Sequence, residues 1–507
     1  LEPLSWIRKN RKGDIHGLIG SLFRWSDKSD KNFKRCVQAF MAYTFYILPE
    51  LSDSQRKKFL EGINPAEGDG LEDSFLKDFS KSVSVALRKR NVHGCGHPLV
   101  TYQGSPEKKA PRVMAGKSHI QSENILDDLQ LFNLDGGLKL YQEFTRLYKP
   151  LLFGLSDRQK WLDFIASQPR DNNFQPPVKG GTIHFLQEPG GKLRSIASPL
   201  RIHQEALRPL GEELYSVVQS LPWDCTFDQS KAIPHIQSHL RQGGQVHSID
   251  LSSATDHFPL KLQLVALKAI FYKSDWDHLE LFERISRSVW DSPLGKLTWT
   301  KGQPLGLFPS FASFTLTHGL LLFHLNGRHF DDSFFVVGDD VIILSDELKD
   351  KYIAMLDQMS CPWSIDKSLS SSKLAEFAGK IINSSWVIPQ LKWRSISNDN
   401  FLDICRLLGK KSRCLLNKRQ KRVFDKVANL CDPIGLNFSC PGDNLESMVK
   451  RTLDFYRPAE FVLGSLMGLS KKLNKLVHTS SEPFDALQLK ELSATFDEKV
   501  KSALSKT

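Results

Sequence analysis

The chain lacks the cysteine spacing of a metal-binding or disulfide-stapled domain. Its eight cysteines are scattered over 507 residues without a Cys-x-x-Cys pair. No secretory signal accompanies them, so we expect reduced thiols and a protein that is not secreted. Residues 93–97, His-Gly-Cys-Gly-His, offer three soft ligands. Because no second cluster completes a tetrahedral zinc site, we interpret this segment as a glycine-rich loop.

The chain also lacks an internal repeat and a long hydrophobic run. Its richest apolar segment, residues 311–325, is interrupted by hydroxyl residues and by His318, so no segment is expected to span a bilayer. The N-terminal residues mix Lys and Arg with Asp and Glu, which is not typical of a transit peptide. Because the sequence begins with Leu1, we expect a fragment or a processed product.

What is present is a large basic chain with enough apolar residues for an extensive core. Hydrophobic residues make up 40% and aromatic residues 10% of the sequence, which excludes a disordered composition. The length predicts about three domains or one multi-lobed enzyme. The formal charge of +11 and the pI near 9.1 suit a polyanionic partner, nucleic acid before an anionic membrane, although general solubility explains them equally well.

Residues 333–344 place Gly338, Asp339 and Asp340 between two short, apolar, β-prone runs. This pattern predicts a β-hairpin with two carboxylates at its tip. Carboxylates on a rigid turn hold hard cations such as Mg²⁺, which serve substrate phosphates. An ordinary solvated turn has the same local pattern, so other segments must decide between the two interpretations.

A second acidic segment, residues 248–258, precedes the hairpin. Asp250 ends an apolar strand, and Asp256 stands before Pro259, a residue typical of a helix start. Taken alone, Asp250 is explained equally well as an ordinary carboxylate at a strand end, and Asp256 as a helix N-cap, as either is by a catalytic role. Asp339 lies 89 residues after Asp250. If their strands are neighbours, these carboxylates can bridge the two cations of a phosphoryl-transfer site.

Two glycine-rich loops complete the pattern. Residues 302–318 run from a Gly/Pro loop containing Gly306 into an apolar helix, and such a loop lets backbone approach a substrate closely. A plain loop before a core helix has the same appearance. Residues 188–197 predict a Gly-Gly hairpin that carries Lys192 and Arg194, and arginine suits bidentate phosphate binding.

Hydrophobic periodicity predicts the elements around these segments. The mixture of helices with antiparallel hairpins predicts an α+β fold. We expect strands at 182–186 and 245–249, helices at 33–48, 54–63, 202–220, 260–272, 275–289, 310–325 and 347–359, and mostly helix after residue 397.

Taken in chain order, the glycine-rich and acidic segments resemble the palm of RNA-dependent RNA polymerases of the mitovirus, narnavirus and ourmia-like group. These are distant relatives of RNA bacteriophage replicases. The strings EPGGKLRSIA, DLSSATD, GQPLG with FTLTH, and VVGDD carry the resemblance. They match the family's motif F at 188–197, A at 248–258, B at 302–318 and C at 336–341, followed by D at 364–368 and E at 376–380.

The resemblance implies a right-hand polymerase. Residues 1–178 would form the N-terminal region and fingers, 179–395 the fingers and a palm with an antiparallel sheet, and 396–507 a helical thumb. It implies template-directed RNA synthesis from ribonucleoside triphosphates with two Mg²⁺ ions, for which Mn²⁺ can substitute, and replication of a positive-strand viral genome. Template and product RNA are the expected partners, and host proteins are unknown. Relatives replicate in mitochondria or cytoplasm, and the sequence does not choose between them.

Matching positions imply individual roles. Asp250 and Asp339 would be the principal metal ligands, Asp340 a supporting carboxylate, and Lys367 a proton donor to pyrophosphate, unless it is an ordinary loop lysine. The asparagine with which many polymerases read the ribose has no clear match; Ser310, Thr315 or Thr317 could replace it. Nucleotide contacts are implied for Lys192, Arg194, Asp256 (at the ribose 2′-hydroxyl), Gly306 and Ser310. A basic run is expected to contact RNA, although a solvated helix face explains it equally well: Lys410, Lys411, Arg413, Lys418, Arg419, Lys421 and Arg422.

Two rival interpretations remain. Reverse transcriptases share the palm, but here Thr255 and Asp256 occupy the region of their aromatic steric gate, and Gly338 replaces the residue that precedes their acidic pair. The other rival is a catalytically silent, RNA-binding remnant of an endogenised viral polymerase, although every acidic palm residue is present.

Overall fold

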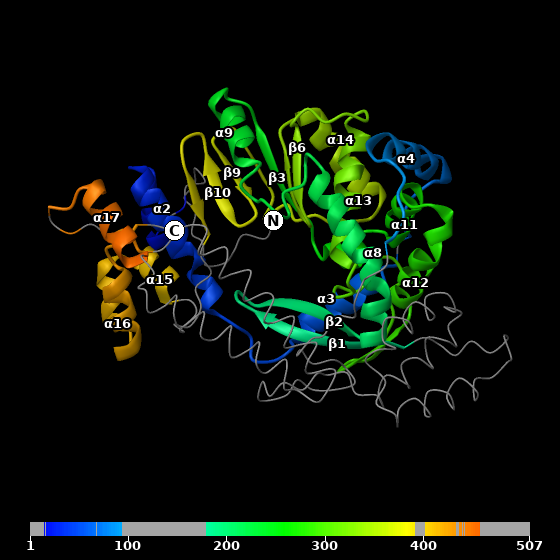
Figure 1. Ribbon diagram of the computed structural model, residues 1–507, viewed down its shortest axis with the longest axis horizontal. Helices are drawn as coiled ribbons and strands as arrows, with labels where there is room; N and C mark the ends of the chain where they lie inside the picture. Colours follow the sequence, from blue (N-terminus) through cyan, green and yellow to red (C-terminus); the bar gives the residue numbers. More distant parts are fainter. Residues whose placement is uncertain are drawn as a thin grey trace, which may run out of the picture.

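A computed structural model of the protein describes residues 15, 17–66, 68–93, 179–390, 401–431, 435–438, 440 and 442–456. Figure 1 shows their arrangement. Expectations for residues 94–178, which include most of the glycine-rich segment 93–97, and for residues 457–507 lie outside this part of the chain.

A four-stranded antiparallel sheet, ordered β6-β7-β3-β8, lies at the centre of the described structure. Alternate residues enter two different cores, as the two-residue period of a strand requires. Phe334 and Val336 join one core, whereas Phe335 and Ile342 join the other. Burial on both faces fixes the register of the sheet. Its strands are β3 (Val246–Asp250), β6 (Phe334–Val337), β7 (Asp340–Ile343) and β8 (Leu369–Ser371).

Different elements cover the two faces of this sheet. Helices α13 (Ser310–Leu325) and α14 (Asp346–Gln358) pack on one side, against β6 and β7. Helix α9 (Ile233–Arg241) and a second antiparallel sheet lie on the other side (Figure 1). The strands of this second sheet are β9 (Leu374–Phe377), β10 (Lys380–Asn383) and β11 (Val387–Pro389).

A long hairpin dominates the third sheet, ordered β2-β1-β4-β5. Its turn contains Gly190 and Gly191, both with positive φ, a conformation that favours glycine. β1 pairs in parallel with β4 and antiparallel with β2. The strands are β1 (Lys179–Glu188), β2 (Lys192–Pro199), β4 (Val289–Ser292) and β5 (Gly295–Leu297).

Helices pack around these sheets. α4 contacts α11 and α13, and α8 contacts α12 and α13, so α13 lies in the interior and is buried along almost its whole length. The surrounding elements are α3 (Asp53–Ile63), α4 (Asp73–Ala86), α8 (Arg201–Ser220), α10 (Ala254–His257), α11 (Leu260–Ile270), η2 (Lys273–Asp275) and α12 (Trp276–Ser286).

The N-terminal segment links two of the sheets. It contains α1 (Gly17–Ser26), α2 (Asp30–Phe40) and η1 (Met41–Phe45). On α2, Gln38 Nε2 donates to the Pro389 carbonyl of β11 at 2.7 Å. The chain then reaches the β1–β2 turn, where Gly190 N–H donates to the Tyr46 carbonyl at 2.7 Å.

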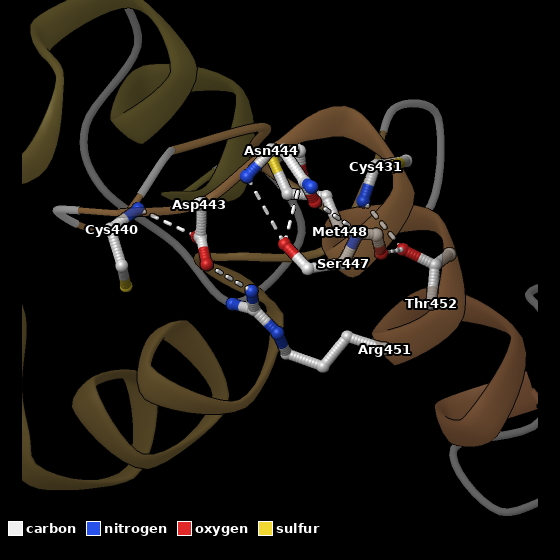
Figure 2. A network of polar contacts seen from close by, with 8 residues as sticks. All are labelled: Cys431, Cys440, Asp443, Asn444, Ser447, Met448, Arg451 and Thr452. Carbon is white, nitrogen blue, oxygen red and sulfur yellow. Dashed lines mark hydrogen bonds and ion pairs between the residues drawn. The ribbon is translucent and has the colours of Figure 1, made fainter.

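The described C-terminal residues form a helical unit with its own apolar cluster around Cys405, Phe424 and Leu430. Figure 2 shows the polar contacts that join the loop after α16 to α17. There the Cys431 N–H donates to Thr452 Oγ1 at 2.8 Å, and Arg451 pairs with Asp443. The unit comprises α15 (Phe401–Leu408), η3 (Lys410–Leu415), α16 (Lys418–Val427) and α17 (Leu445–Tyr456).

The combination of helices with largely antiparallel sheets confirms the expected α+β class. Two expected helices are wrong at their ends. The helix predicted for 33–48 ends as α2 at Phe40 and is followed by η1 to Phe45, and the helix predicted for 275–289 stops at Ser286, before Val289 begins β4. Val289 pairs with Lys179 of β1, a distant partner that local periodicity does not reveal. None of the described helices is long and apolar enough to cross a membrane.

Candidate active site

The turn between β6 and β7 presents Asp339. Val337 pairs with Asp340, so Gly338 and Asp339 are the two central turn residues. Gly338 has a φ of +59°, whereas Asp339 is not among the residues with positive φ, a pattern typical of a type II′ turn. A Cβ atom at Gly338 would also lie 2.8 Å from the Phe311 ring. The predicted hairpin is confirmed, with Asp339 exposed at its tip and Asp340 at the start of β7.

Asp250 lies directly across from Asp340. The two residues are paired in the antiparallel register of β3 and β7, so their side chains leave the same face of the sheet. Like charges in this position destabilise a strand pair unless a cation compensates for them. The fold therefore brings together two acidic segments that are 89 residues apart in the sequence.

The electrostatics around Asp340 are strongly acidic. The pKa of Asp340 is raised to about 7, first by burial and then by the charges of Asp339, Glu376 and Asp250, while the charge of Lys192 lowers it. Burial and the charge of Asp250 also raise the pKa of Glu376. Four carboxyl groups from β3, the β6–β7 turn, β7 and β9 therefore share one region.

Asp250 is held by the segment at 364–368. Its N–H donates to Ser368 Oγ at 3.1 Å, and its carbonyl accepts the Ser364 N–H at 2.8 Å. Lys367 Nζ lies 3.4 Å from Asp250 Oδ2. Apart from this ion pair, Oδ2 is a buried oxygen that accepts no hydrogen bond, so it retains capacity for a further cationic partner.

This donor set fits a hard divalent cation. Such ions take carboxylate oxygens as ligands, and the cluster provides crowded carboxylates together with the unsatisfied Oδ2 of Asp250. In the residues that the structure describes, no group of three or more His, Cys, Asp or Glu side chains is already arranged to hold a metal ion. Asp339 is the exposed member of the carboxylate cluster.

The β1–β2 hairpin places Lys192 and Arg194 near these carboxylates. Arg194 makes a two-pronged contact with Glu188 across the hairpin, Nε to Oε1 at 2.8 Å and Nη2 to Oε2 at 3.2 Å. The hydrogen bonds that Arg194 donates to Glu188 are the main cause of the raised pKa of Arg194, and the charge of Asp339 adds to it. Lys192 is exposed, and its charge influences Asp340.

Two glutamines anchor this hairpin to α3. Gln55 Nε2 donates to the Gly191 carbonyl at 2.9 Å and to Gln187 Oε1 at 3.1 Å. Gln187 in turn donates to the Glu50 carbonyl at 3.0 Å. The basic hairpin is therefore fixed to the N-terminal segment through Gln187 of β1 and through the turn at Gly191.

Asp256 lies inside α10, so the expectation of a helix N-cap at this residue is wrong. The carboxyl group is buried, which raises its pKa to about 6. Its Oδ1 accepts the indole N–H of Trp299 at 2.8 Å. Trp299 is a partner that sequence reasoning missed, since nothing in the sequence relates it to Asp256.

The loop before α13 packs against β2. The Ala197 N–H donates to the Leu305 carbonyl at 2.7 Å, and a Cβ atom at Gly306 would lie 2.1 Å from the Ala197 carbonyl oxygen. Close packing therefore explains Gly306 here. Ser310 is fully buried, and its Oγ donates to the Pro304 carbonyl at 3.1 Å, an arrangement that does not present it to a nucleotide.

The basic run lies on η3 and α16, in the C-terminal helical unit, which Figure 1 shows away from the central sheet that carries Asp250 and Asp340. Arg413 forms a two-pronged ion pair with Asp425 at 2.7 and 2.8 Å. The two lysines of η3 and the four basic residues of α16 that belong to the run are partly or fully exposed: Lys410, Lys411, Lys418, Arg419, Lys421 and Arg422.

Glu376 is the acidic residue of the site that sequence reasoning missed. The sequence placed Glu376 in the segment that resembles motif E, at 376–380, but gave it no role of its own. On β9 the neighbouring residues Ala375 and Phe377 are buried in the core, so strand alternation turns Glu376 to the opposite face. Its N–H donates to Ser248 Oγ of β3 at 2.9 Å. The alternation Ala-Glu-Phe was the available signal.

A family model described as mitovirus RNA-dependent RNA polymerase matches residues 103–436, about two thirds of the chain. The chain belongs to this family. A curated relative, the RNA-directed RNA polymerase of Cryphonectria parasitica mitovirus 1, is 30% identical over 207 residues, which are 40% of this chain and 25% of that protein. The mitovirus-like chain thus aligns with about a quarter of this curated polymerase.

Two uncharacterized mitochondrial proteins of Arabidopsis thaliana are also similar. One is 29% identical over 164 residues, covering 29% of the mitovirus-like chain and 76% of its own. The other is 28% identical over 176 residues, covering 32% and 68%. Among solved structures, the RNA-dependent RNA polymerase of a human picobirnavirus aligns with a TM-score of 0.33 at 14% identity, over 64% of this chain and 65% of its own.

Proposed function

We propose that this chain carries out template-directed RNA synthesis, transferring nucleotides from ribonucleoside triphosphates to an RNA 3′-hydroxyl. The observation that carries the proposal is the placement of Asp250 opposite Asp340, one residue from the Asp339 turn, in a member of a polymerase family. A solvated turn has no reason to share its region with carboxylates from two other strands.

Asp250 and Asp339 would hold two Mg²⁺ ions, with Asp340 as a supporting carboxylate. When bound, these ions would lower the pKa of the 3′-hydroxyl and neutralise charge on the leaving pyrophosphate, and Mn²⁺ could replace them. The unsatisfied Oδ2 of Asp250 supports this role. The raised pKa of Asp340 also supports it, because carboxylates that repel one another gain most from a shared cation.

Lys192 and Arg194 would bind the triphosphate of the incoming nucleotide. Arg194 already points its planar fork at the carboxylate of Glu188. A triphosphate offers the same two-pronged acceptor geometry with more charge. Nucleotide binding would therefore exchange the Glu188 contact for a phosphate contact while β1 and β2 stay paired.

Lys367 and Asp256 would act at opposite ends of the nucleotide. Lys367 is mostly exposed and pairs with Asp250, so metal binding to Asp250 would free its ammonium group to protonate pyrophosphate. Asp256 would accept from the ribose 2′-hydroxyl with the oxygen that Trp299 leaves available.

The wider assignments follow from family membership. The chain would form a right hand, with fingers within 1–178, fingers and palm in 179–395, and a thumb in 396–507 that carries the basic run toward template or product RNA. It would replicate a positive-strand viral RNA. The mitovirus family and the similar plant mitochondrial proteins support a mitochondrial site of action.

A primer-extension assay with Mg²⁺ and four ribonucleotides tests the proposal. Wild-type protein should extend the primer, and Asp339→Asn should lose nearly all incorporation while keeping its thermal midpoint, because Asp339 is exposed at the tip of the turn. Asp454→Asn, an exposed change on α17, serves as the matched control and should extend normally.

Failure of the wild type would overturn the catalytic proposal. If purified wild-type protein binds RNA but incorporates nothing under conditions in which a related polymerase works, the chain is a silent RNA-binding remnant. Efficient incorporation of deoxynucleotides on the same template would instead favour a reverse transcriptase.

A further inference from the structure

A buried polar chain runs from α14 through α13 to the catalytic turn. Tyr352 of α14 contacts His318 Nε2 through its hydroxyl at 2.6 Å, and His318 Nδ1 lies 2.8 Å from the Gly338 carbonyl oxygen. Both side chains have no exposed surface. Buried groups of this kind are costly unless fully hydrogen-bonded, so the geometry is strongly constrained.

The donors and acceptors of this chain can be assigned. The Gly338 carbonyl can only accept, so His318 Nδ1 carries the proton and donates it. Burial lowers the pKa of His318 to about 4, which keeps the imidazole neutral and leaves Nε2 as an acceptor. The Tyr352 hydroxyl therefore donates to Nε2. One orientation of the ring satisfies both contacts.

The carbonyl that His318 contacts belongs to the peptide group between Gly338 and Asp339. Because that group is planar, fixing its carbonyl fixes the plane from which the Asp339 backbone departs. Phe311, seven residues before His318 on α13, packs against Gly338 from the same helix. The turn therefore meets α13 at both a hydrogen bond and a ring contact.

We propose that His318 and Tyr352 are positioning residues that set the direction of the Asp339 carboxylate through the Gly338–Asp339 peptide group. The inference rests on the proposed function of Asp339 as a metal ligand. Neither residue touches the carboxylates, so each acts through the turn backbone. Without the imidazole N–H, the peptide group can rotate, and Asp339 loses its fixed approach to Asp250 and Asp340.

His318→Leu tests the inference, with Mn²⁺ as the probe. Electron paramagnetic resonance of MnCl₂ titrations, without RNA or nucleotide, should show about tenfold weaker binding, the low end of the effect of groups that orient a metal ligand. In primer extension, kcat should fall while KM for nucleotides stays near the wild-type value. His318→Asn keeps an N–H donor near the Nδ1 position and should recover part of both losses.

A matched control lies on the same helix. His324 is half-buried, and its Nδ1 contacts Ser82 of α4 at 2.7 Å, far along α13 from the turn. His324→Leu should lower the thermal midpoint but leave Mn²⁺ affinity unchanged. If His318→Leu behaves in the same way, His318 is a packing residue and the inference fails.

Tyr352→Phe provides the test if His318→Leu does not fold. It removes only the hydroxyl, and a smaller loss of Mn²⁺ affinity and kcat than in His318→Leu is expected; wild-type values would overturn the role of Tyr352. Failure of the proposed function is distinguishable, because wild type and Asp339→Asn would then bind Mn²⁺ equally.

Discussion

Replacing Asp340 with asparagine is expected to stabilise the metal-free protein at neutral and higher pH while weakening catalysis. Asp340 is held near three other carboxyl groups, and its pKa is raised to about 7 from the ordinary 3.8, first by burial and then by their charges. A neutral amide of the same shape removes the ionisation that this environment opposes. The site would thus trade stability for function.

The pKa of Asp340 sets the size and the sign of the effect. A difference of about 3 pKa units corresponds to about 4 kcal/mol at most, and solvent screening of a half-buried side chain reduces it to about 1–2 kcal/mol. The folded state binds the proton more tightly than the unfolded state. The associated stability is therefore present below the ordinary pKa of 3.8 and is lost as pH rises through about 7.

Urea unfolding in the presence of a chelator, followed by tryptophan fluorescence, measures this contribution. Near pH 8, Asp340→Asn should be more stable than wild type by about 1–2 kcal/mol, and near pH 5 the difference should be smaller. Adding Mg²⁺ should stabilise the wild type more than the variant, because the ion binds the folded site. Asp454→Asn should follow the wild type throughout.

A pH-independent difference between Asp340→Asn and wild type would refute the electrostatic reasoning. So would a variant that is less stable than wild type near pH 8 in chelator. Either result would mean that Asp340 accepts structural hydrogen bonds whose loss exceeds the relief of repulsion.

Three further outcomes are expected. Lys192→Ala should raise KM for nucleotides about tenfold with a smaller change in kcat, as loss of one charged phosphate contact predicts; steady-state nucleotide titration measures it, and an unchanged KM contradicts the assignment. Glu376→Gln should weaken Mn²⁺ binding about tenfold, as measured by titration with electron paramagnetic resonance, and wild-type affinity would exclude Glu376 from the metal site. Neutralising Lys418, Lys421 and Arg422 together should flatten the salt dependence of RNA binding by about 0.7 in log–log slope per lost phosphate contact; an unchanged slope would remove α16 from the RNA surface.

Local sequence patterns were sufficient to predict elements that are stabilised mainly by local contacts or are buried along their whole length. Helix 310–325 was predicted with the bounds of α13, because its start after Pro309 and its apolar length are both visible in sequence. The β6–β7 hairpin was predicted from its two apolar runs and Gly338. The end of α12 was not, since Val289 leaves the helical pattern only because β1 is available as a partner.

Contacts between distant segments limited the prediction of the candidate site. The sequence indicated that Asp250 and Asp339 belong together only through motif order, and the β3–β7 register then placed Asp250 opposite Asp340. The hydrogen bond between Trp299 and Asp256 joins residues 43 apart that share no motif. The contact between Arg194 and Glu188 was accessible in principle, because a hairpin that pairs Glu188 with Lys192 across a Gly-Gly turn places Arg194 diagonally opposite Glu188 on the same face.

The contact between Gln38 and Pro389 spans 351 residues of sequence, and it has a consequence for biosynthesis. At about 5–20 residues per second, a ribosome needs roughly 20–70 s to make the strand on which α2 will pack. During that time Phe33, whose ring partner in the folded protein is Trp386, has no native surface to cover it. α2 is therefore made well before the strand on which it docks, which exposes it to chaperones and to aggregation until β11 has been synthesised.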